Sequence, residues 1–172
     1  MKKILSLLLV FFATASIAED DCDPQILHAS YSYAQNSDYR YHIVKARMVS
    51  EGVDPEMTRP EPHYAAVRTV GVSLGAKGKR TPFDRVITMI CKPDMSCLER
   101  YVDTDAEEAL LIFVAESEGV YFVDARFTCD DIVNRIMMQP RLIYPAGEKE
   151  LNYVQGCLDR GKCETPQSRE LR

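Results

Sequence analysis

The apolar stretch at residues 107–127 constrains the fold more than any other part of the chain. Its first half, residues 110–115, is apolar at every position, which predicts a central β-strand covered on both faces. Its second half, residues 120–127, is rich in β-branched and aromatic residues, which favour strands. We therefore predict two strands joined by a turn at Gly119, because glycine tolerates the positive φ that such turns need.

A helix is the alternative for the same stretch. Thr104 is a suitable N-cap, Glu107 is its capping-box partner, and Gly119 can end the helix. The run at residues 110–114 lacks the polar stripe that a surface helix shows. For this reason we prefer the two strands.

The first 18 residues have the features of a secretory signal peptide. Lys2 and Lys3 precede an apolar run, and Ser16 and Ala18 are the small residues that a cleavage site needs. The apolar run is too short to span a bilayer, and no later stretch reaches the roughly 20 apolar residues of a membrane helix. We expect cleavage after Ala18 and export to a bacterial periplasm, without a membrane span.

The chain that remains after cleavage is long enough for a single domain. It has 154 residues (172 − 18), and we expect one globular domain at residues 19–163 and a loose tail at residues 164–172. Loss of Lys2 and Lys3 leaves 19 basic against 26 acidic residues, so the formal net charge changes from −5 to −7. Nucleic acid is not expected as a partner, because phosphate contacts need clustered cations.

All six cysteines lie after the leader. They are Cys22, Cys91, Cys97, Cys129, Cys157 and Cys163. An even number of cysteines in an exported chain predicts disulfides. The segments from Cys91 to Cys97 and from Cys157 to Cys163 have equal lengths and enclose turn-forming residues, so we predict two local bridges, which leaves Cys22 to pair with Cys129.

Neither a metal nor another cofactor is expected. Zinc sites use shorter cysteine spacings or histidines at helical spacing. The three histidines, His28, His42 and His63, are instead scattered along the chain.

Residues 26–48 contain four tyrosines around the tripeptide Gln35-Asn36-Ser37. If this tripeptide is the turn of a β-hairpin, Tyr33 faces Tyr39 and Tyr31 faces Tyr41, with all four rings on one face. A long helix over residues 24–49 is the alternative. Because tyrosine gives large contact area at low entropic cost, we predict that these tyrosines form a protein-binding surface.

Residues 65–74 and 83–91 alternate in hydropathy as two further strands would. The connection between them carries Lys77, Lys79 and Arg80, which we predict form a basic hairpin tip and a second candidate contact for a partner. A phosphate-binding loop is excluded, because Gly78-Lys79 is followed by arginine where serine or threonine is needed.

The remaining segments complete the prediction of an α+β fold. Residues 50–63 hold three prolines and should form a surface loop, whereas residues 97–102 suit either a strand or a short helix. Helices are predicted at residues 130–138 and 147–160, with a short strand at residues 141–144. We thus expect a disulfide-stabilised antiparallel sheet of about five to seven strands with two C-terminal helices.

Known catalytic motifs are absent from the sequence. Ser73 and Ser117 lack the sharp-turn context of a serine nucleophile, and the acidic run at residues 103–108 shows no sign of burial. We therefore expect a non-catalytic periplasmic protein-binding domain, of the inhibitor or immunity-protein type, that neutralises another envelope or secreted protein. A small hydrolase with a site made of histidine and carboxylate, and a structural envelope component, are the alternatives.

Overall fold

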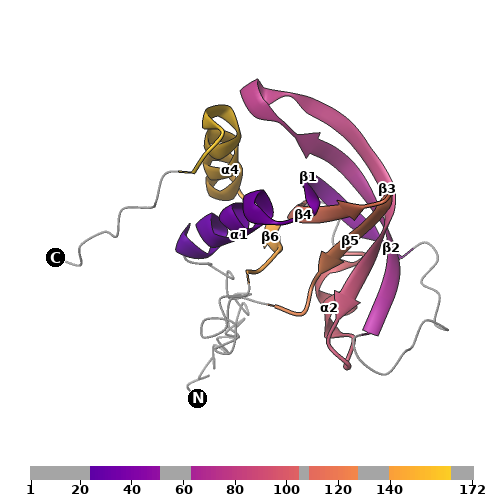
Figure 1. The fold of residues 1–172 in the computed structure, drawn as a ribbon. Coiled ribbons are helices and arrows are strands. Elements are labelled where there is room, and N and C mark those ends of the chain that lie inside the picture. Colours follow the sequence, from indigo (N-terminus) through magenta and orange to yellow (C-terminus); the bar gives the residue numbers. More distant parts are fainter. Residues whose placement is uncertain (1–23, 51–62, 105–108, 128–139, 164–172) are drawn as a thin grey trace, which may run out of the picture.

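A computed structural model describes residues 24–50, 63–104, 109–127 and 140–163 of the chain (Figure 1). These residues form helices α1, α2 and α4, the short 3-10 helix η2, and six strands. In chain order the elements are α1 (Pro24–Asn36), β1 (Arg40–Val49), β2 (His63–Leu74), η2 (Ala76–Gly78), β3 (Arg80–Cys91), α2 (Ser96–Tyr101), β4 (Leu110–Ser117), β5 (Val120–Asp124), β6 (Ile143–Pro145) and α4 (Glu148–Arg160).

The six strands form one mixed sheet that closes into a barrel. Their order is β1-β2-β3-β5-β4-β6, and β1 also pairs with β4, which closes a ring of five strands. Strands β3 and β5 are parallel, whereas the other pairs are antiparallel. The predicted α+β class and strand number are confirmed, but the prediction of a purely antiparallel sheet was wrong. The hydropathy pattern reports burial and carries no information on strand direction.

The path of the chain around the barrel matches the connectivity of the OB-fold, a five-stranded Greek-key barrel. The ring runs β1-β2-β3-β5-β4, and α2 lies in the connection between β3 and β4. Strand β6 and the two longer helices, α1 and α4, are additions to this barrel. A barrel of this kind serves many functions, so its connectivity alone assigns none.

Strand β4 is the centre of the fold, as the sequence predicts. Its residues from Leu110 to Ala115 are all buried. One face points into the barrel, and the other packs against α1. Strand β6 lies beside β4 in the sheet, with Phe113 in ring contact with Tyr144 at 6.2 Å. The predicted turn to β5 is also confirmed, with φ of 51° at Glu118 and 81° at Gly119.

The N-terminal tyrosine segment is half helix and half strand. Residues 24–36 form α1 and residues 40–49 form β1, so both the predicted hairpin and the alternative long helix were wrong. Leu27 and Tyr31 lie one helical turn apart and are both buried, which explains why α1 is stable here. Ser30, between them, is also buried and its hydroxyl lies 2.6 Å from the Tyr144 hydroxyl.

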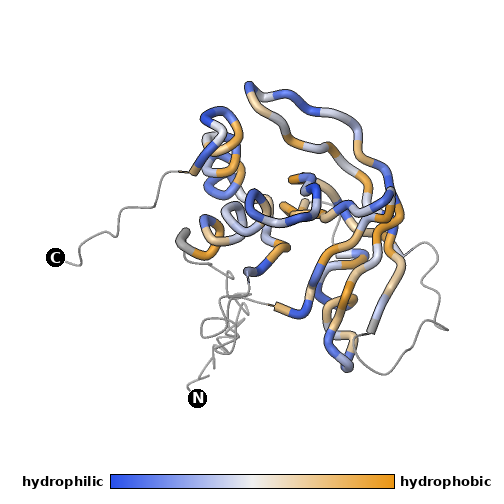
Figure 2. The backbone as a smooth tube through the Cα atoms, viewed as in Figure 1, coloured by the Kyte–Doolittle hydropathy of each residue, from blue (hydrophilic) through white to orange (hydrophobic). Residues whose placement is uncertain are grey.

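The predicted β2–β3 hairpin is confirmed, and it is long. Twelve residue pairs join the two strands, from His63↔Cys91 to Leu74↔Arg80. Its tip bends over to α4, where the backbone N–H of Lys77 donates to Asp159 (2.6 Å) and Gln155 donates to the carbonyl of Gly75 (3.0 Å) (Figure 1). Figure 2 shows that this tip is hydrophilic, whereas most of the hydrophobic residues lie in the barrel strands.

Two of the three predicted disulfides lie in the described part of the chain, and both are present. Cys91 is bonded to Cys97 and Cys157 to Cys163. The first joins the end of β3 to α2, so the segment at residues 97–102 is the helix of the two alternatives. The predicted Cys22–Cys129 bridge lies outside the described residues.

The C-terminal predictions are confirmed where they can be compared. Helix α4 covers residues 148–160 and ends at Gly161, with φ of 69°, and β6 is the predicted short strand. The predicted signal peptide, the proline-rich loop and the helix at residues 130–138 lie outside the described residues. No helix in the described part of the chain is long and apolar enough to cross a membrane.

Candidate functional site

Four aromatic side chains gather on the outside of the barrel beside the end of α1. They are Tyr33, Tyr39, Tyr41 and Phe122, and we call them the aromatic surface. The strand register explains their position, because Tyr41 pairs with Ala115 and Ala115 pairs with Phe122, so all three share one face of the sheet. The small Ala115 side chain lies between the two rings.

The rings of the aromatic surface hold one another in place. Tyr33 from α1 meets Tyr41 edge-to-face at 6.1 Å, and Tyr39 meets Phe122 edge-to-face at 5.1 Å. Tyr33 and Tyr39 are each 46% exposed, which is high for aromatic residues. Burial, the neighbouring Tyr33 and the charge of Asp124 raise the pKa of Tyr41 far above its ordinary value, so its hydroxyl stays neutral.

The aromatic surface contains three of the four tyrosines that the sequence singled out. The predicted pairs were wrong, because Tyr33 contacts Tyr41 in place of Tyr39, and Tyr31 lies on the buried side of α1 at 4% exposure. Phe122 was missed. The sequence placed Phe122 in the predicted strand at residues 120–127. Only the pairing of β5 with β4 brings it to the same face of the sheet as Tyr41.

The basic hairpin tip lies at α4 and not among these rings. Lys77, Lys79 and Arg80 are exposed, and the backbone of Lys77 is anchored to Asp159. The structure therefore separates the two predicted contact regions.

A second cluster lies on the inner face of the sheet at one mouth of the barrel. His42 Nε2 lies 2.6 Å from a carboxylate oxygen of Glu116, and Arg40 lies 3.8 Å from the same oxygen. The rings of His42, Phe83 and Tyr121 pack together, with centroid distances of 5.7 to 6.1 Å. The guanidinium of Arg85 lies over Tyr121 at 6.0 Å.

The partners of Glu116 keep it ionised. The hydrogen bond from His42 lowers the pKa of the Glu116 carboxyl, with smaller contributions from Arg40 and from the Tyr121 hydroxyl, while partial burial opposes them. The side chains of His42 and Glu116 are 19% and 20% exposed, so the pair can still be reached by solvent.

The other two histidines lie on α1 and at the start of β2. His28 Nδ1 lies 2.9 Å from the Tyr153 hydroxyl, which links α1 to α4. His63 is the first residue of β2. Within residues 24–50, 63–104, 109–127 and 140–163, no group of three or more potential ligands could hold a metal ion.

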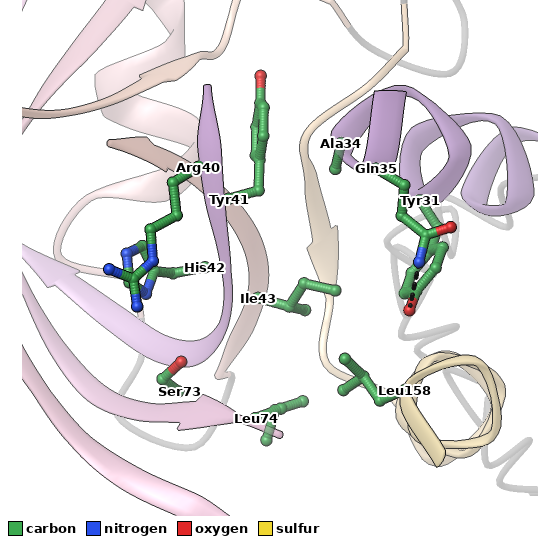
Figure 3. A pocket seen from close by; sticks show the side chains of 10 residues that line it. All are labelled: Tyr31, Ala34, Gln35, Arg40, Tyr41, His42, Ile43, Ser73, Leu74 and Leu158. Atoms are coloured by element: carbon green, nitrogen blue, oxygen red, sulfur yellow. Dashed lines mark hydrogen bonds between the residues drawn. The ribbon is translucent and has the colours of Figure 1, made fainter. Parts of the chain in front are cut away.

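A groove of about 330 Å³ lies between the aromatic surface and the barrel mouth (Figure 3). It is bounded by α1, the first half of β1, the end of β2, and α4. Its lining residues are Tyr31, Ala34, Gln35, Arg40, Tyr41, His42, Ile43, Ser73, Leu74 and Leu158. The volume is at the lower end of the range for ligand sites.

The chain was compared with protein families, curated proteins and solved structures. No protein family matches it, and neither a curated protein nor a solved structure matches it.

Proposed function

We propose that this protein is a non-catalytic binding domain that is exported to the periplasm and neutralises another envelope or secreted protein, as inhibitors and immunity proteins do. The aromatic surface is the observation that carries this proposal. Aromatic residues are enriched at protein interfaces and dominate their binding energy, because they bury large areas with few rotatable bonds. Tyr33 and Tyr39 are exposed yet already ordered by their ring contacts.

The arrangement also suits a preformed interface. Three of the rings come from α1, β1 and β5, and Tyr39, in the short bend between α1 and β1, is held by its contact with Phe122, so the relative positions of the rings depend on the folded barrel. Binding then costs less ordering entropy than it would for a surface that forms on contact. Val120, 58% exposed at the start of β5, extends the apolar part of this surface.

Site-specific photo-crosslinking tests the proposal. A photoreactive phenylalanine analogue replaces Tyr39 in one variant and Val70, 43% exposed on β2, in a control variant. Each is expressed in the native host and irradiated under oxidising conditions. We expect one discrete crosslinked protein with the probe at position 39 and none with the probe at position 70.

A further substitution sharpens the result. Tyr33→Ala, placed in the Tyr39 probe variant, should reduce the crosslinked product by about tenfold, as loss of an interface anchor does. Absence of any crosslinked protein at position 39, or the same products at both positions, contradicts the proposal.

A hydrolase is the second candidate, and one observation favours it. His42 is oriented by Glu116 and lines the groove together with Ser73, whose pairing with Val44 puts it on the same face of the sheet as His42. A serine nucleophile, a histidine base and an orienting carboxylate form the usual group for acyl transfer. We rank this function second, because no hydrogen bond joins Ser73 to His42 in the described residues.

Hydrolysis assays separate the two candidates. Activated esters and peptide substrates should be stable in the presence of the wild-type protein, within the background of buffer. A turnover that disappears in both His42→Gln and Ser73→Ala variants would support the hydrolase in place of the binding domain.

A further inference from the structure

Strand β1 has neighbours on both sides along only part of its length. It pairs with β4 from Arg40 to Ala46, but its pairing with β2 begins at Val44↔Ser73 and continues toward Val49. Among the described residues, the first four positions of β1 therefore have a strand on one side only. The groove lies on the other side, where β2 would continue.

The direction of the backbone groups follows from the ladder of β4. The N–H of Phe113 donates to Leu142, on the β6 side, so odd-numbered residues of β4 point away from β1. Even-numbered residues of β4 then bond to β1, and their partners there include Arg40 and His42. The N–H and C=O of Tyr41, between these two, must point into the groove.

The β2–β3 hairpin does not cover this edge, because α4 holds its tip elsewhere. After Leu74 the chain enters the turn with η2, and this turn is bonded to Gln155 and Asp159 of α4. Figure 1 shows the hairpin curving away from the start of β1 toward α4. The gap beside the start of β1 is thus maintained by the hydrogen bonds between the hairpin tip and α4.

The two sides of the groove differ in polarity, as expected where one strand of a sheet is missing. On the outer face Ile43, Leu74 and Leu158 are apolar, and they lie near Gln35, whose side-chain amide donates to the Tyr31 hydroxyl at 3.2 Å (Figure 3). On the inner face the groove is polar, with Arg40, His42 and Ser73. Side chains of a strand alternate between two such faces.

The charge of the residues that line the groove indicates which polar side chain a bound segment would carry. Arg40 has a side chain that is 77% exposed and only a loose contact with Glu116, at 3.8 Å. Glu116 already accepts hydrogen bonds from His42 and Tyr121. The residues that line the groove include no carboxylate. An acidic side chain therefore complements this face.

We propose that the groove binds an extended peptide segment of a partner protein, which adds as a strand to β1 beside Arg40 to Ile43. The segment alternates an acidic side chain, which pairs with Arg40, with an apolar side chain, which packs between Ile43, Leu74 and Leu158. Its backbone bonds to the N–H and C=O of Tyr41, as in other cases of strand addition to an exposed edge. The inference rests on the proposed protein-binding function and names how part of the partner is held.

Amide hydrogen exchange of the full-length exported protein tests the edge first. The Tyr41 amide should exchange at least about tenfold faster than the neighbouring His42 amide, because only the latter is bonded within the sheet. A Tyr41 amide that is already protected in the isolated protein would show that another part of the same chain fills the groove, and would overturn the proposal.

Peptide selection tests the occupant. Phage-displayed random nonapeptides are selected on the wild-type protein, and we expect enriched sequences to alternate acidic and apolar residues. A synthetic selected peptide should slow exchange of the Tyr41 amide, and N-methylation of its central amide should abolish binding. Failure to enrich any sequence, or binding that leaves the Tyr41 amide unchanged, overturns the proposal.

A matched pair of arginine variants tests the charge. Arg40→Gln should weaken binding of the selected peptide by about tenfold, which equals a loss of ~1.4 kcal/mol. Arg47→Gln, at an exposed arginine in the half of β1 that β2 covers, should leave the affinity unchanged. Equal effects of the two substitutions would contradict a specific contact at Arg40.

The outcomes also separate this inference from the proposed function. A partner crosslinked at position 39 that leaves the Tyr41 amide unprotected would retain the binding function and exclude strand addition. A peptide that protects the Tyr41 amide, without any protein crosslinked at position 39, would retain strand addition and contradict binding of a partner at the aromatic surface.

Discussion

The two halves of β1 have the same strand conformation but opposite environments. Residues Val44 to Val49 pair with β2, the first three of them also with β4, and Val44, Ala46 and Met48 are buried inside the barrel. Residues Arg40 to Ile43 pair with β4 alone and border the groove. Strand pairing on both sides thus builds the core, whereas the lack of a β2 neighbour leaves backbone groups and polar side chains available for binding.

The largest expected effect is in the closed half. Met48→Ala should lower the free energy of unfolding by about 3 kcal/mol, because it leaves a cavity at a side chain that is 2% exposed. Arg40→Ala, in the open half, should change it by less than about 0.5 kcal/mol, since its side chain is mostly in solvent. Urea denaturation of both variants measures the difference, and similar losses would contradict the contrast between the halves.

The next effect concerns the contact that keeps β2 away from the open half. Asp159→Ala removes the acceptor for the backbone N–H of Lys77 and should lower the free energy of unfolding by about 1 kcal/mol. Exchange of the Lys77 amide should become faster, while the amides of the closed half of β1 keep their protection. Asp159→Asn, which retains an acceptor oxygen, is the control and should lie near the wild type.

A smaller effect is expected in the aromatic surface that borders the open half. A double-mutant cycle with Tyr39→Ala and Phe122→Ala should give a coupling energy of about 0.5 kcal/mol, at the low end for aromatic pairs because Tyr39 is exposed. The same cycle with Val70→Ala and Phe122→Ala should give a coupling near zero. A coupling of equal size in both cycles would mean that the ring contact is not the cause.

The smallest effect should come from the ion pair at the barrel mouth, and it should depend on pH. Folding lowers the pKa of Glu116, so its contribution to stability is fully present above the ordinary carboxyl pKa of about 4.3 and is lost as the pH falls through the folded value. Glu116→Gln should therefore be less stable than the wild type at neutral pH and nearly equal to it in strong acid. Thermal unfolding at both pH values measures this, and a difference that does not change with pH would argue against the pair.

The sequence predicted best those features that depend on neighbours in the chain. The strand at residues 110–115, the turn at Gly119, the β2–β3 hairpin and the helix that ends at Gly161 all follow from local patterns. The bridges Cys91–Cys97 and Cys157–Cys163 followed from their equal short spacing and turn residues. In each case the stabilising contacts join residues close in sequence.

The tyrosine segment was predicted wrongly because two local patterns compete there. The tyrosines alternate as in a strand, but Leu27 and Tyr31 have helical spacing, and burial of these two against the sheet selects the helix. The candidate site was predicted only in part. Its tyrosines were recognised from composition, whereas Phe122 and the His42–Glu116 contact, 74 residues apart in sequence, were not.

Local sequence patterns predict which segments are buried, where the chain turns, and which nearby cysteines can be bridged, because these properties depend on short-range sterics and hydropathy. Packing of the whole molecule sets the rest: β3 and β5 run parallel, β1 closes the barrel against β4, and the pairing of β1 with β2 begins only at Val44. Hydrophobic burial is not directional, so many strand arrangements bury the same residues. The arrangement that packs the whole molecule selects one of them, and with it the position of the groove and of the aromatic surface.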